Sequence, residues 1–511
     1  MTAVLLSLGL VACGSTDGAP EETTAAGMLT EVSDVTEVPT ATPPTDAITE
    51  APTESAAESS TEAPVADITE AITEMPTEVP TEAPTEAFTE APTETPTEVP
   101  TEPETEAETK LPIKDVLGLD VHMSDLSELM QPIFSGTTSV NETVMFLDYG
   151  DVKTLLYPIE SIISVTSYDG SRVYEEGKDY MVEDGKLLLL EGSSIPCITS
   201  EKFYNSPDSQ LLSMYEGKYV PTHWGEGTIM TDWQVNVNYT HAEGWSGFEQ
   251  PCELETLQSF VKKLQAGEDV TVHFYGDSIT TGATSSWLWN YAPYQDSYPQ
   301  LLVKALADLF GYTVHFQPTN LISFNGMGTP MVPAKDYVAG DRGTITYINT
   351  AVGGWTSVNA VTYFDEYVGD WIDRYGCDLM IVAFGMNDGA VNCAPRATSK
   401  NLEKVIKSVW EKDEDVNIIL MSTMMPNPNA NTAWFNYQDK QETYIKDIVD
   451  KYRQQDKPCA MTYMTSLSLS VLERKSFHDY SGNNINHPND YFSRVYAQML
   501  LETVLGYENM N

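Results

Sequence analysis

The first 109 residues of this 511-residue chain contain no lysine and no arginine, although they hold 24 of its 76 acidic residues. The remainder has 52 acidic residues against 27 basic ones, so both parts carry a net negative charge. Nucleic acids and anionic lipid surfaces attract basic patches through their phosphate groups. The composition therefore predicts no nucleic-acid partner and favours a neutral polymer such as a glycan.

Cysteine is also scarce, and the six cysteines include no Cys-x-x-Cys pair and accompany no histidine cluster. This spacing argues against a dense disulfide framework and against a cysteine-rich zinc site, and we expect neither a metal nor another cofactor. Five of the cysteines are expected to pack as isolated thiols: Cys197, Cys252, Cys377, Cys393 and Cys459. A bridge between one pair, such as Cys377 and Cys393, is the alternative.

No apolar run has the length of a lasting membrane-spanning helix. The run over residues 3–12 is short and leads into Ala12-Cys13-Gly14. Residues 1–13 thereby resemble a bacterial lipoprotein signal, in which the cysteine becomes the lipidated first residue of the mature protein. The resemblance implies an exported protein that is held at the cell surface by a lipid on Cys13 alone. No basic residue precedes the apolar run, although signal peptides usually begin with one. An ordinary signal peptide with an incidental cysteine is the alternative.

Residues 14–110 consist largely of Thr-Glu-Ala-Pro and Thr-Glu-Val-Pro units. Frequent proline, like charges and few large apolar side chains leave no core to offset chain entropy. We expect a disordered tether, which at ~3.1 Å per residue extends to roughly 300 Å at most.

Residues 111–250 show short alternating runs separated by turn signals. Strands are predicted over 143–147 and 162–168, and a hairpin over 180–190 turns at Asp184-Gly185. We expect a small all-β sandwich or jelly roll. Core packing is the favoured role of four aromatic residues and sugar stacking the alternative: Trp224, Trp233, Tyr239 and Trp245.

From residue 251 to residue 511 strands alternate with helices. Helices are predicted over 298–309 and 490–505. The predicted strands are apolar runs at 270–275, 344–349, 378–384, 416–422 and 460–464. This alternation predicts an α/β domain whose doubly wound, mostly parallel sheet has helices on both faces.

Polar motifs follow three of these strands, and a fourth motif precedes the last helix. They are Gly-Asp-Ser-Ile at 276–279, Asn-Thr-Ala-Val-Gly-Gly-Trp at 349–355, Gly-Met-Asn-Asp at 385–388 and Asn-His-Pro-Asn-Asp at 486–490. Open α/β sheets bind their ligands at the carboxyl ends of the strands. We therefore expect the motifs to meet at one edge of the sheet.

Together the motifs contain the groups that acyl transfer by a serine needs, namely a nucleophile, a base and donors for the developing oxyanion. Ser278 lies on a predicted strand-to-helix turn and His487 is the best candidate base. The side-chain amide of Asn387 and the backbone N–H groups of Gly354 and Ser278 are candidate oxyanion donors. Asp277 and Asp388 are expected to hold their loops by hydrogen bonds.

These motifs resemble the sequence blocks of the SGNH (GDSL-type) hydrolase superfamily, over about residues 265–511. The resemblance implies that Ser278 is the nucleophile, that His487 is the base, and that Gly354 and Asn387 complete the oxyanion hole with the Ser278 N–H.

One position departs from the family pattern, because Asn484 stands where an aspartate usually precedes the histidine by three residues. Asn484, Asp490 and Asp479 are the candidates for orienting the imidazole. A backbone carbonyl in that role, which leaves a Ser–His dyad, is the alternative.

A β-domain before an SGNH domain also resembles bacterial two-domain carbohydrate esterases, which remove acetyl groups from polysaccharides such as xylan. We therefore expect a cell-surface serine esterase acting on acetylated polysaccharide through an acyl-enzyme. One alternative is a lipid or peptidoglycan O-acyl esterase that uses the same site. Another is a catalytically inactive glycan-binding surface protein, which the departure at Asn484 motivates.

Overall fold

The computed structural model describes residues 125–242, 244–318, 335–431 and 437–507. The predicted signal segment with Cys13 and the predicted tether over 14–110 lie outside the described residues, so both stay predictions. Among the described residues, no helix combines the length and the apolar character that crossing a membrane requires. No disulfide joins any two of the five cysteines within the described ranges.

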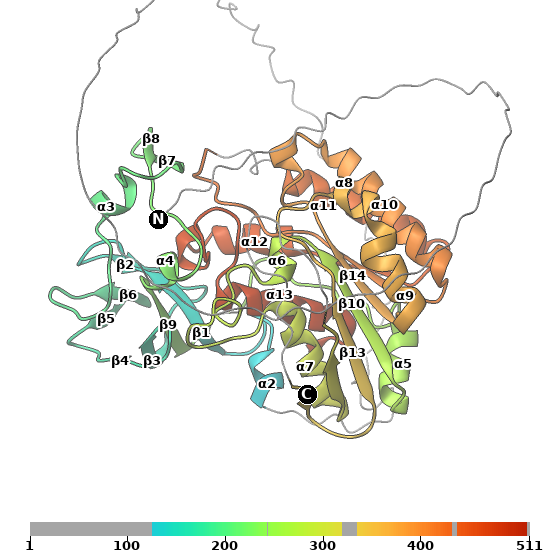
Figure 1. Ribbon diagram of the computed structural model, residues 1–511. Helices are drawn as coiled ribbons and strands as arrows, with labels where there is room; N and C mark the ends of the chain where they lie inside the picture. Colours follow the sequence, from blue (N-terminus) through green and yellow to red (C-terminus); the bar gives the residue numbers. More distant parts are fainter. Residues whose placement is uncertain (1–124, 243, 319–334, 432–436, 508–511) are drawn as a thin grey trace, which may run out of the picture. The chain divides into compact units, whose positions relative to one another are not determined.

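The first described region is built from antiparallel strands and short helices (Figure 1). One sheet has the order β1 (Thr138–Met145), β9 (Gln234–Thr240), β3 (Ser161–Ser167), β4 (Val173–Tyr174). Another has the order β2 (Val152–Lys153), β6 (Lys186–Leu189), β5 (Tyr180–Glu183), and a third pairs β7 (Leu212–Tyr215) with β8 (Lys218–Pro221). The short helices are α2 (Asp125–Leu129), α3 (Ser200–Tyr204) and α4 (Thr228–Thr231).

The predicted hairpin is present, because β5 and β6 pair with Glu183 opposite Lys186 around Asp184-Gly185. Both residues of this turn have positive φ, 48° and 72°, a conformation that asparagine, aspartate and glycine adopt most readily. The sandwich or jelly-roll topology and the boundaries of a separate β-domain stay predictions.

A seven-stranded sheet forms the centre of the second region, and all its neighbouring strands are parallel except β12 and β11. This confirms the predicted α/β fold with a mostly parallel sheet. The strand order is β12 (Tyr337–Val338), β11 (Thr313–Phe316), β13 (Thr344–Asn349), β10 (Val270–Gly276), β14 (Leu379–Ala383), β15 (Asn417–Met421), β16 (Cys459–Thr462).

Alternate residues of the central strands pack into two separate hydrophobic clusters. Leu379 and Ile381 of β14 belong to one cluster, whereas Met380 and Val382 belong to the other. The first cluster includes residues of α5 (Gln258–Ala266), α7 (Tyr298–Phe310), α12 (Met464–Leu472) and α13 (Asp490–Val504). The second includes residues of α8 (Ser357–Thr362), α9 (Asp370–Tyr375), α10 (Pro395–Lys412) and α11 (Gln438–Arg453). Successive side chains of a strand point to opposite faces of the sheet, so both faces are apolar here and helices pack on each of them.

The antiparallel sheet of β1 and β9 is joined to the C-terminal part of the chain by buried polar contacts. The Asn489 amide donates to Thr143 Oγ1 and Gln234 Oε1 over 2.9 and 2.8 Å. Lys475 Nζ lies 2.6 Å from Glu142 Oε1, and neither side chain is exposed to solvent. These contacts fix the region of antiparallel strands from β1 to β9, called the β-region below, against the segment that contains His487.

Replacing Lys475 by methionine is expected to lower the free energy of unfolding by about 3–5 kcal/mol, because the Glu142 carboxylate loses its buried countercharge. Urea denaturation of the full chain at pH 7 measures this loss. Lys178→Met is the matched control, since the Lys178–Glu175 pair is exposed and screened by water, so its loss is expected to change the free energy of unfolding only slightly. A similar small loss in Lys475→Met would contradict the interpretation.

Candidate active site

Ser278 begins the short helix α6 (Ser278–Thr281), directly after the central strand β10. The Asp277 side chain caps this helix by accepting a hydrogen bond from Ile279 N over 3.0 Å. Gly276 is required by packing, because a β-carbon there would lie 2.1 Å from Thr280 Oγ1 and 2.8 Å from Ala383 O. The Gly-Asp-Ser motif therefore makes a tight strand-to-helix turn that places the Ser278 side chain at the edge of the sheet.

His487 meets Ser278 at this edge, with 2.8 Å between His487 Nε2 and Ser278 Oγ. The other ring nitrogen, Nδ1, lies 3.0 Å from Glu226 Oε1. Ser278 and His487 are both almost fully buried, and the Glu226 side chain is 22% exposed. The three side chains form a continuous Ser–His–carboxylate chain, which is the arrangement that activates a serine hydroxyl.

Glu226 lies between β8 and α4 in the β-region, and Asn483 fastens it to the histidine segment. Asn483 Nδ2 donates to Glu226 Oε1 over 2.9 Å, while Asn483 Oδ1 accepts from the backbone N–H of His487 over 3.0 Å. Asn483 thus fixes both Glu226 and His487 with a single side chain.

The sequence analysis did not identify Glu226, because it is 261 residues from His487 and belongs to none of the four motifs. The position of this carboxylate follows only from the way the β-region packs on the region of the seven-stranded sheet. No local sequence signal distinguishes it from the many other glutamates of the chain.

The three residues proposed to orient the imidazole have other partners in the structure, which corrects that part of the sequence prediction. Asn484 Nδ2 donates to His223 O over 2.8 Å and so holds the segment that precedes Glu226. Asp490 Oδ1 accepts from the backbone of Ser286, and Asp479 Oδ1 accepts from the backbone of Met145. The Nδ1 partner is thus a carboxylate from the β-region rather than a neighbour of His487 in sequence, and it replaces the dyad alternative as well.

The environment favours the protonated form of His487. Burial alone would lower the pKa of the imidazole, but the charge and hydrogen bond of Glu226 and the charge of Asp277 together raise it above 6.5. Burial raises the pKa of Asp277 to about 7, against the opposing effects of the Ile279 N–H and of His487. The site can therefore stabilise the imidazolium that forms when Ser278 loses its proton.

The candidate oxyanion donors follow the strands on either side of β10. Gly354 lies after β13 and Asn387 after β14, and both strands pair directly with β10. Asn387 Nδ2 donates to the backbone carbonyl of Trp355 over 2.9 Å, which ties the two loops together. Gly354 is exposed and has a φ of 79°, a left-handed conformation that favours glycine. The topology thus brings Ser278, Gly354 and Asn387 to one edge of the sheet.

Asp388 holds the loop beside Asn387, as the sequence predicted. Its carboxylate accepts from Ser357 N over 3.0 Å and from Thr398 Oγ1 over 2.8 Å. Asp277 has the corresponding role at the Ser278 turn. Both aspartates act through hydrogen bonds to the chain rather than through contact with the serine hydroxyl.

Aromatic residues adjoin two of the site's segments. Trp355 stacks with Tyr363 at a centroid distance of 5.2 Å, and 43% of Tyr363 is exposed. Trp289 is 40% exposed and lies against Gly227, the residue after Glu226. The four aromatic residues singled out in the sequence instead pack in hydrophobic clusters or against them, as the favoured interpretation predicted. Tyr239 is a buried member of a cluster, and the other three are partly buried and pack against one: Trp224, Trp233 and Trp245.

One protein family matches part of this chain. Residues 333–494 match the model of the GDSL-like Lipase/Acylhydrolase family. This range contains the segments of Gly354, Asn387 and His487, whereas Ser278 lies before it. An arylesterase of Vibrio mimicus is 29% identical over 85 residues, which is 17% of this chain and 39% of the arylesterase.

Solved structures of esterases are also similar to this chain. A two-domain esterase (CEX) active on acetylated mannans has 18% sequence identity and a TM-score of 0.35, over 52% of this chain and 56% of the esterase. Axe2, an acetylxylan esterase from Geobacillus stearothermophilus, has 14% identity and a TM-score of 0.32, over 46% of this chain and 94% of Axe2. This chain thus spans little more than half of the two-domain esterase and less than half of the arylesterase. Residues 333–494 thus match a GDSL-like lipase/acylhydrolase domain, which is a domain of ester-hydrolysing enzymes.

Proposed function

We propose that this protein is a cell-surface serine esterase that removes O-acetyl groups from carbohydrates. The observation that carries the proposal is the continuous contact from Ser278 through His487 to Glu226. A serine hydroxyl is a weak nucleophile until an adjacent base removes its proton, and the contacts of His487 with Ser278 and Glu226 support these roles.

The reaction would begin when His487 Nε2 takes the proton of Ser278 Oγ as that oxygen attacks the acetyl carbonyl. The negative charge that develops on the carbonyl oxygen would be held by the N–H groups of Ser278, Gly354 and Asn387. Glu226 would stabilise the imidazolium and keep Nδ1 protonated.

The imidazolium would then return its proton to the sugar oxygen, which leaves as a free hydroxyl group. The acetyl group stays on Ser278 until a water molecule, deprotonated by His487, attacks it. This second step releases acetate and restores the Ser278 hydroxyl. No cofactor takes part in these steps.

A carbohydrate substrate is supported by aromatic surface beside the site and by the charge of the chain. Exposed faces of Trp289 and Tyr363 offer apolar planes next to the segments of Glu226 and Gly354. The net charge of −49 disfavours acidic polymers and anionic lipid surfaces. A lipid or peptidoglycan O-acyl esterase that uses the same three residues is the second candidate.

Acetate release from acetylated xylan, mannan, pectin and peptidoglycan tests the substrate class. We expect release from at least one plant polysaccharide, and a preference for acetyl over long-chain p-nitrophenyl esters. A preference for long-chain esters would instead indicate a lipid esterase. Acetate release from peptidoglycan alone would indicate a peptidoglycan esterase. Binding to a polysaccharide without turnover of any acetyl ester would favour an inactive glycan-binding protein.

Attachment to the cell surface through a lipid on Cys13 belongs to the same proposal. When the chain is expressed in bacteria with radiolabelled palmitate, we expect label in the wild-type protein and none in Cys13→Ala. The variant is also expected in the medium rather than in the membrane fraction. Equal labelling of both proteins would overturn the proposed anchor.

A further inference from the structure

Glu226, the carboxylate beside His487, lies in a Gly-Glu-Gly turn between β8 and α4. Both flanking glycines have positive φ, 154° for Gly225 and 74° for Gly227. Glycine restricts the backbone less than any other residue, so the turn alone does not hold the carboxylate in one place. The position of Glu226 against the imidazole therefore depends on contacts with other parts of the chain.

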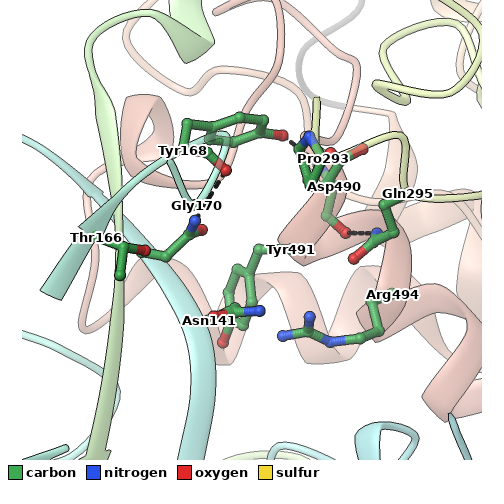
Figure 2. A pocket seen from close by; sticks show the side chains of 10 residues that line it. Asn141, Thr166, Tyr168, Gly170, Pro293, Gln295, Asp490, Tyr491 and Arg494 are labelled. Carbon is green, nitrogen blue, oxygen red and sulfur yellow. Dashed lines mark hydrogen bonds between the residues drawn. The ribbon is translucent and has the colours of Figure 1, made fainter. Parts of the chain in front are cut away.

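Asp490, the next acidic residue in sequence after the catalytic base, is held by contacts of its own. Its backbone N–H donates to Tyr168 Oη over 2.9 Å and its carbonyl accepts from Gln295 Nε2 over 2.6 Å, as Figure 2 shows. Its Oδ1 accepts from the backbone N–H of Ser286 over 2.9 Å. Orientation of the imidazole therefore rests on Glu226 and on the residues that fix Glu226.

The side chain of Asn483 has one defined orientation beside this carboxylate. Its Oδ1 accepts from the backbone N–H groups of Ile485, Asn486 and His487 over 2.9, 2.9 and 3.0 Å. Only the oxygen of an amide group accepts hydrogen bonds, so these three donors distinguish Oδ1 from Nδ2. Asn483 is 1% exposed, so water has little access to either atom.

The Nδ2 group of Asn483 has two N–H donors, and both have partners. They donate to Glu226 Oε1 over 2.9 Å and to Asn486 Oδ1 over 3.1 Å. Glu226 Oε1 also lies 3.0 Å from His487 Nδ1. One carboxylate oxygen thus lies between a fixed amide donor and the imidazole. Movement of this oxygen away from Asn483 would leave a buried donor without a partner, which costs free energy.

The backbone of the same segment adds two contacts to the Glu226 turn. The N–H of Gly225 donates to Asn483 O over 3.3 Å, and Asn484 Nδ2 donates to His223 O over 2.8 Å. Of these two asparagines, Asn483 is the one that contacts the carboxylate.

We propose that Asn483 is a positioning residue that holds the Glu226 carboxylate against His487 Nδ1 during catalysis. The catalytic part of this role rests on the proposed function, whereas the hydrogen bonds of Asn483 do not. Asn483 acts on the reaction through Glu226 and not by contact with Ser278. A carboxylate that is held in place beforehand stabilises the imidazolium without reorganisation as the reaction proceeds.

Asn483→Asp tests this role. Aspartate keeps the Oδ1 acceptor for the three backbone N–H groups, but it replaces the Nδ2 donor by an oxygen that repels Glu226 Oε1. We expect kcat for p-nitrophenyl acetate to fall about 10- to 150-fold, the range for loss of a hydrogen bond to a charged group. KM is expected to change little, because the substitution alters the chemical step and not a contact with the substrate.

Asn489→Asp is the matched control. Asn489 is also buried, its Oδ1 caps α13, and its Nδ2 joins the same two regions through Thr143 and Gln234. Each substitution removes two hydrogen bonds of a buried Nδ2 group, but only Asn483→Asp changes a contact with Glu226. We expect both variants to unfold at a lower temperature and Asn489→Asp to keep a kcat close to that of the wild-type protein. Equal losses of kcat in the two variants would overturn the proposal.

A double-mutant cycle with Glu226→Gln separates an effect through Glu226 from a general disturbance of the site. In the double variant, the carboxylate introduced at position 483 accepts a hydrogen bond from the amide introduced at position 226. We therefore expect the double variant to unfold at a higher temperature than Asn483→Asp, and its kcat to be no lower than that of Glu226→Gln. A further fall in kcat as large as the one that Asn483→Asp causes in the wild-type background would contradict the proposal.

The rate at which a fluorophosphonate modifies Ser278 separates this proposal from the proposed function, because it reports activation of the serine for any ester substrate. We expect rapid modification in the wild-type protein and in Asn489→Asp, and slower modification in Asn483→Asp. Rapid modification without hydrolysis of any acetyl ester would overturn the proposed function and leave the role of Asn483 intact. Equal rates in Asn483→Asp and the wild-type protein would overturn that role alone, and no modification of the wild-type protein would contradict both.

Discussion

Replacement of Glu226 by glutamine is expected to lower kcat about 10⁴-fold while the protein remains folded. Glutamine keeps the size of the side chain but cannot stabilise the imidazolium through charge. It can also present its amide N–H groups to Nδ1, which would favour the wrong tautomer of His487. Hydrolysis of p-nitrophenyl acetate measures the effect, and far-ultraviolet circular dichroism with thermal unfolding checks the fold.

The pH dependence of kcat/KM gives this variant a second readout. In the wild-type protein Glu226 holds the pKa of His487 above 6.5, so activity is expected to fall as the pH drops through that raised value. Without the carboxylate, burial lowers the pKa of His487, and the acidic limb is expected to move to lower pH. A residue that only supported the fold would not move this limb. Glu175→Gln, which removes an exposed carboxylate, is the control and should leave both rate and limb unchanged.

Ser278→Ala is expected to lower kcat about 10⁶-fold, because Ser278 is the one hydroxyl among the described residues that is hydrogen-bonded to His487 Nε2. The change removes only the Oγ atom at the start of α6, so the Asp277 cap and the fold should persist. Ser285→Ala, in the buried turn that follows α6, is the matched control and is expected to change kcat less than about tenfold. Activity in Ser278→Ala close to that of the wild-type protein would contradict the assignment of Ser278 as the nucleophile.

The parts of the site that lie at strand ends could be predicted from the sequence. Alternating strands and helices placed Ser278, Gly354 and Asn387 at the same edge of a parallel sheet, because carboxyl ends of parallel strands meet there. Local sequence patterns also predicted the strand-to-helix turn at the Gly-Asp-Ser motif and the start of α13. The structure has these elements close to the predicted residues.

The carboxylate of the site could not be predicted, because its position depends on long-range packing. Three candidates near His487 in sequence are engaged elsewhere: Asn484, Asp490 and Asp479. Glu226 reaches the imidazole only because the β-region packs on α13 and on the segment that leads to it. Asn484 still contributes, since it holds the backbone of His223 close to Glu226. The departure from the usual family pattern therefore marks a carboxylate supplied by another part of the chain.

The most direct test of the account is the rate at which a fluorophosphonate modifies the protein, followed by intact mass and peptide mapping. The account predicts one adduct per chain on Ser278, rapid in the wild-type protein, much slower in Glu226→Gln and absent in Ser278→Ala. An adduct on another residue, or equal rates in the wild-type protein and Glu226→Gln, would contradict a Ser278 nucleophile activated by His487 and Glu226.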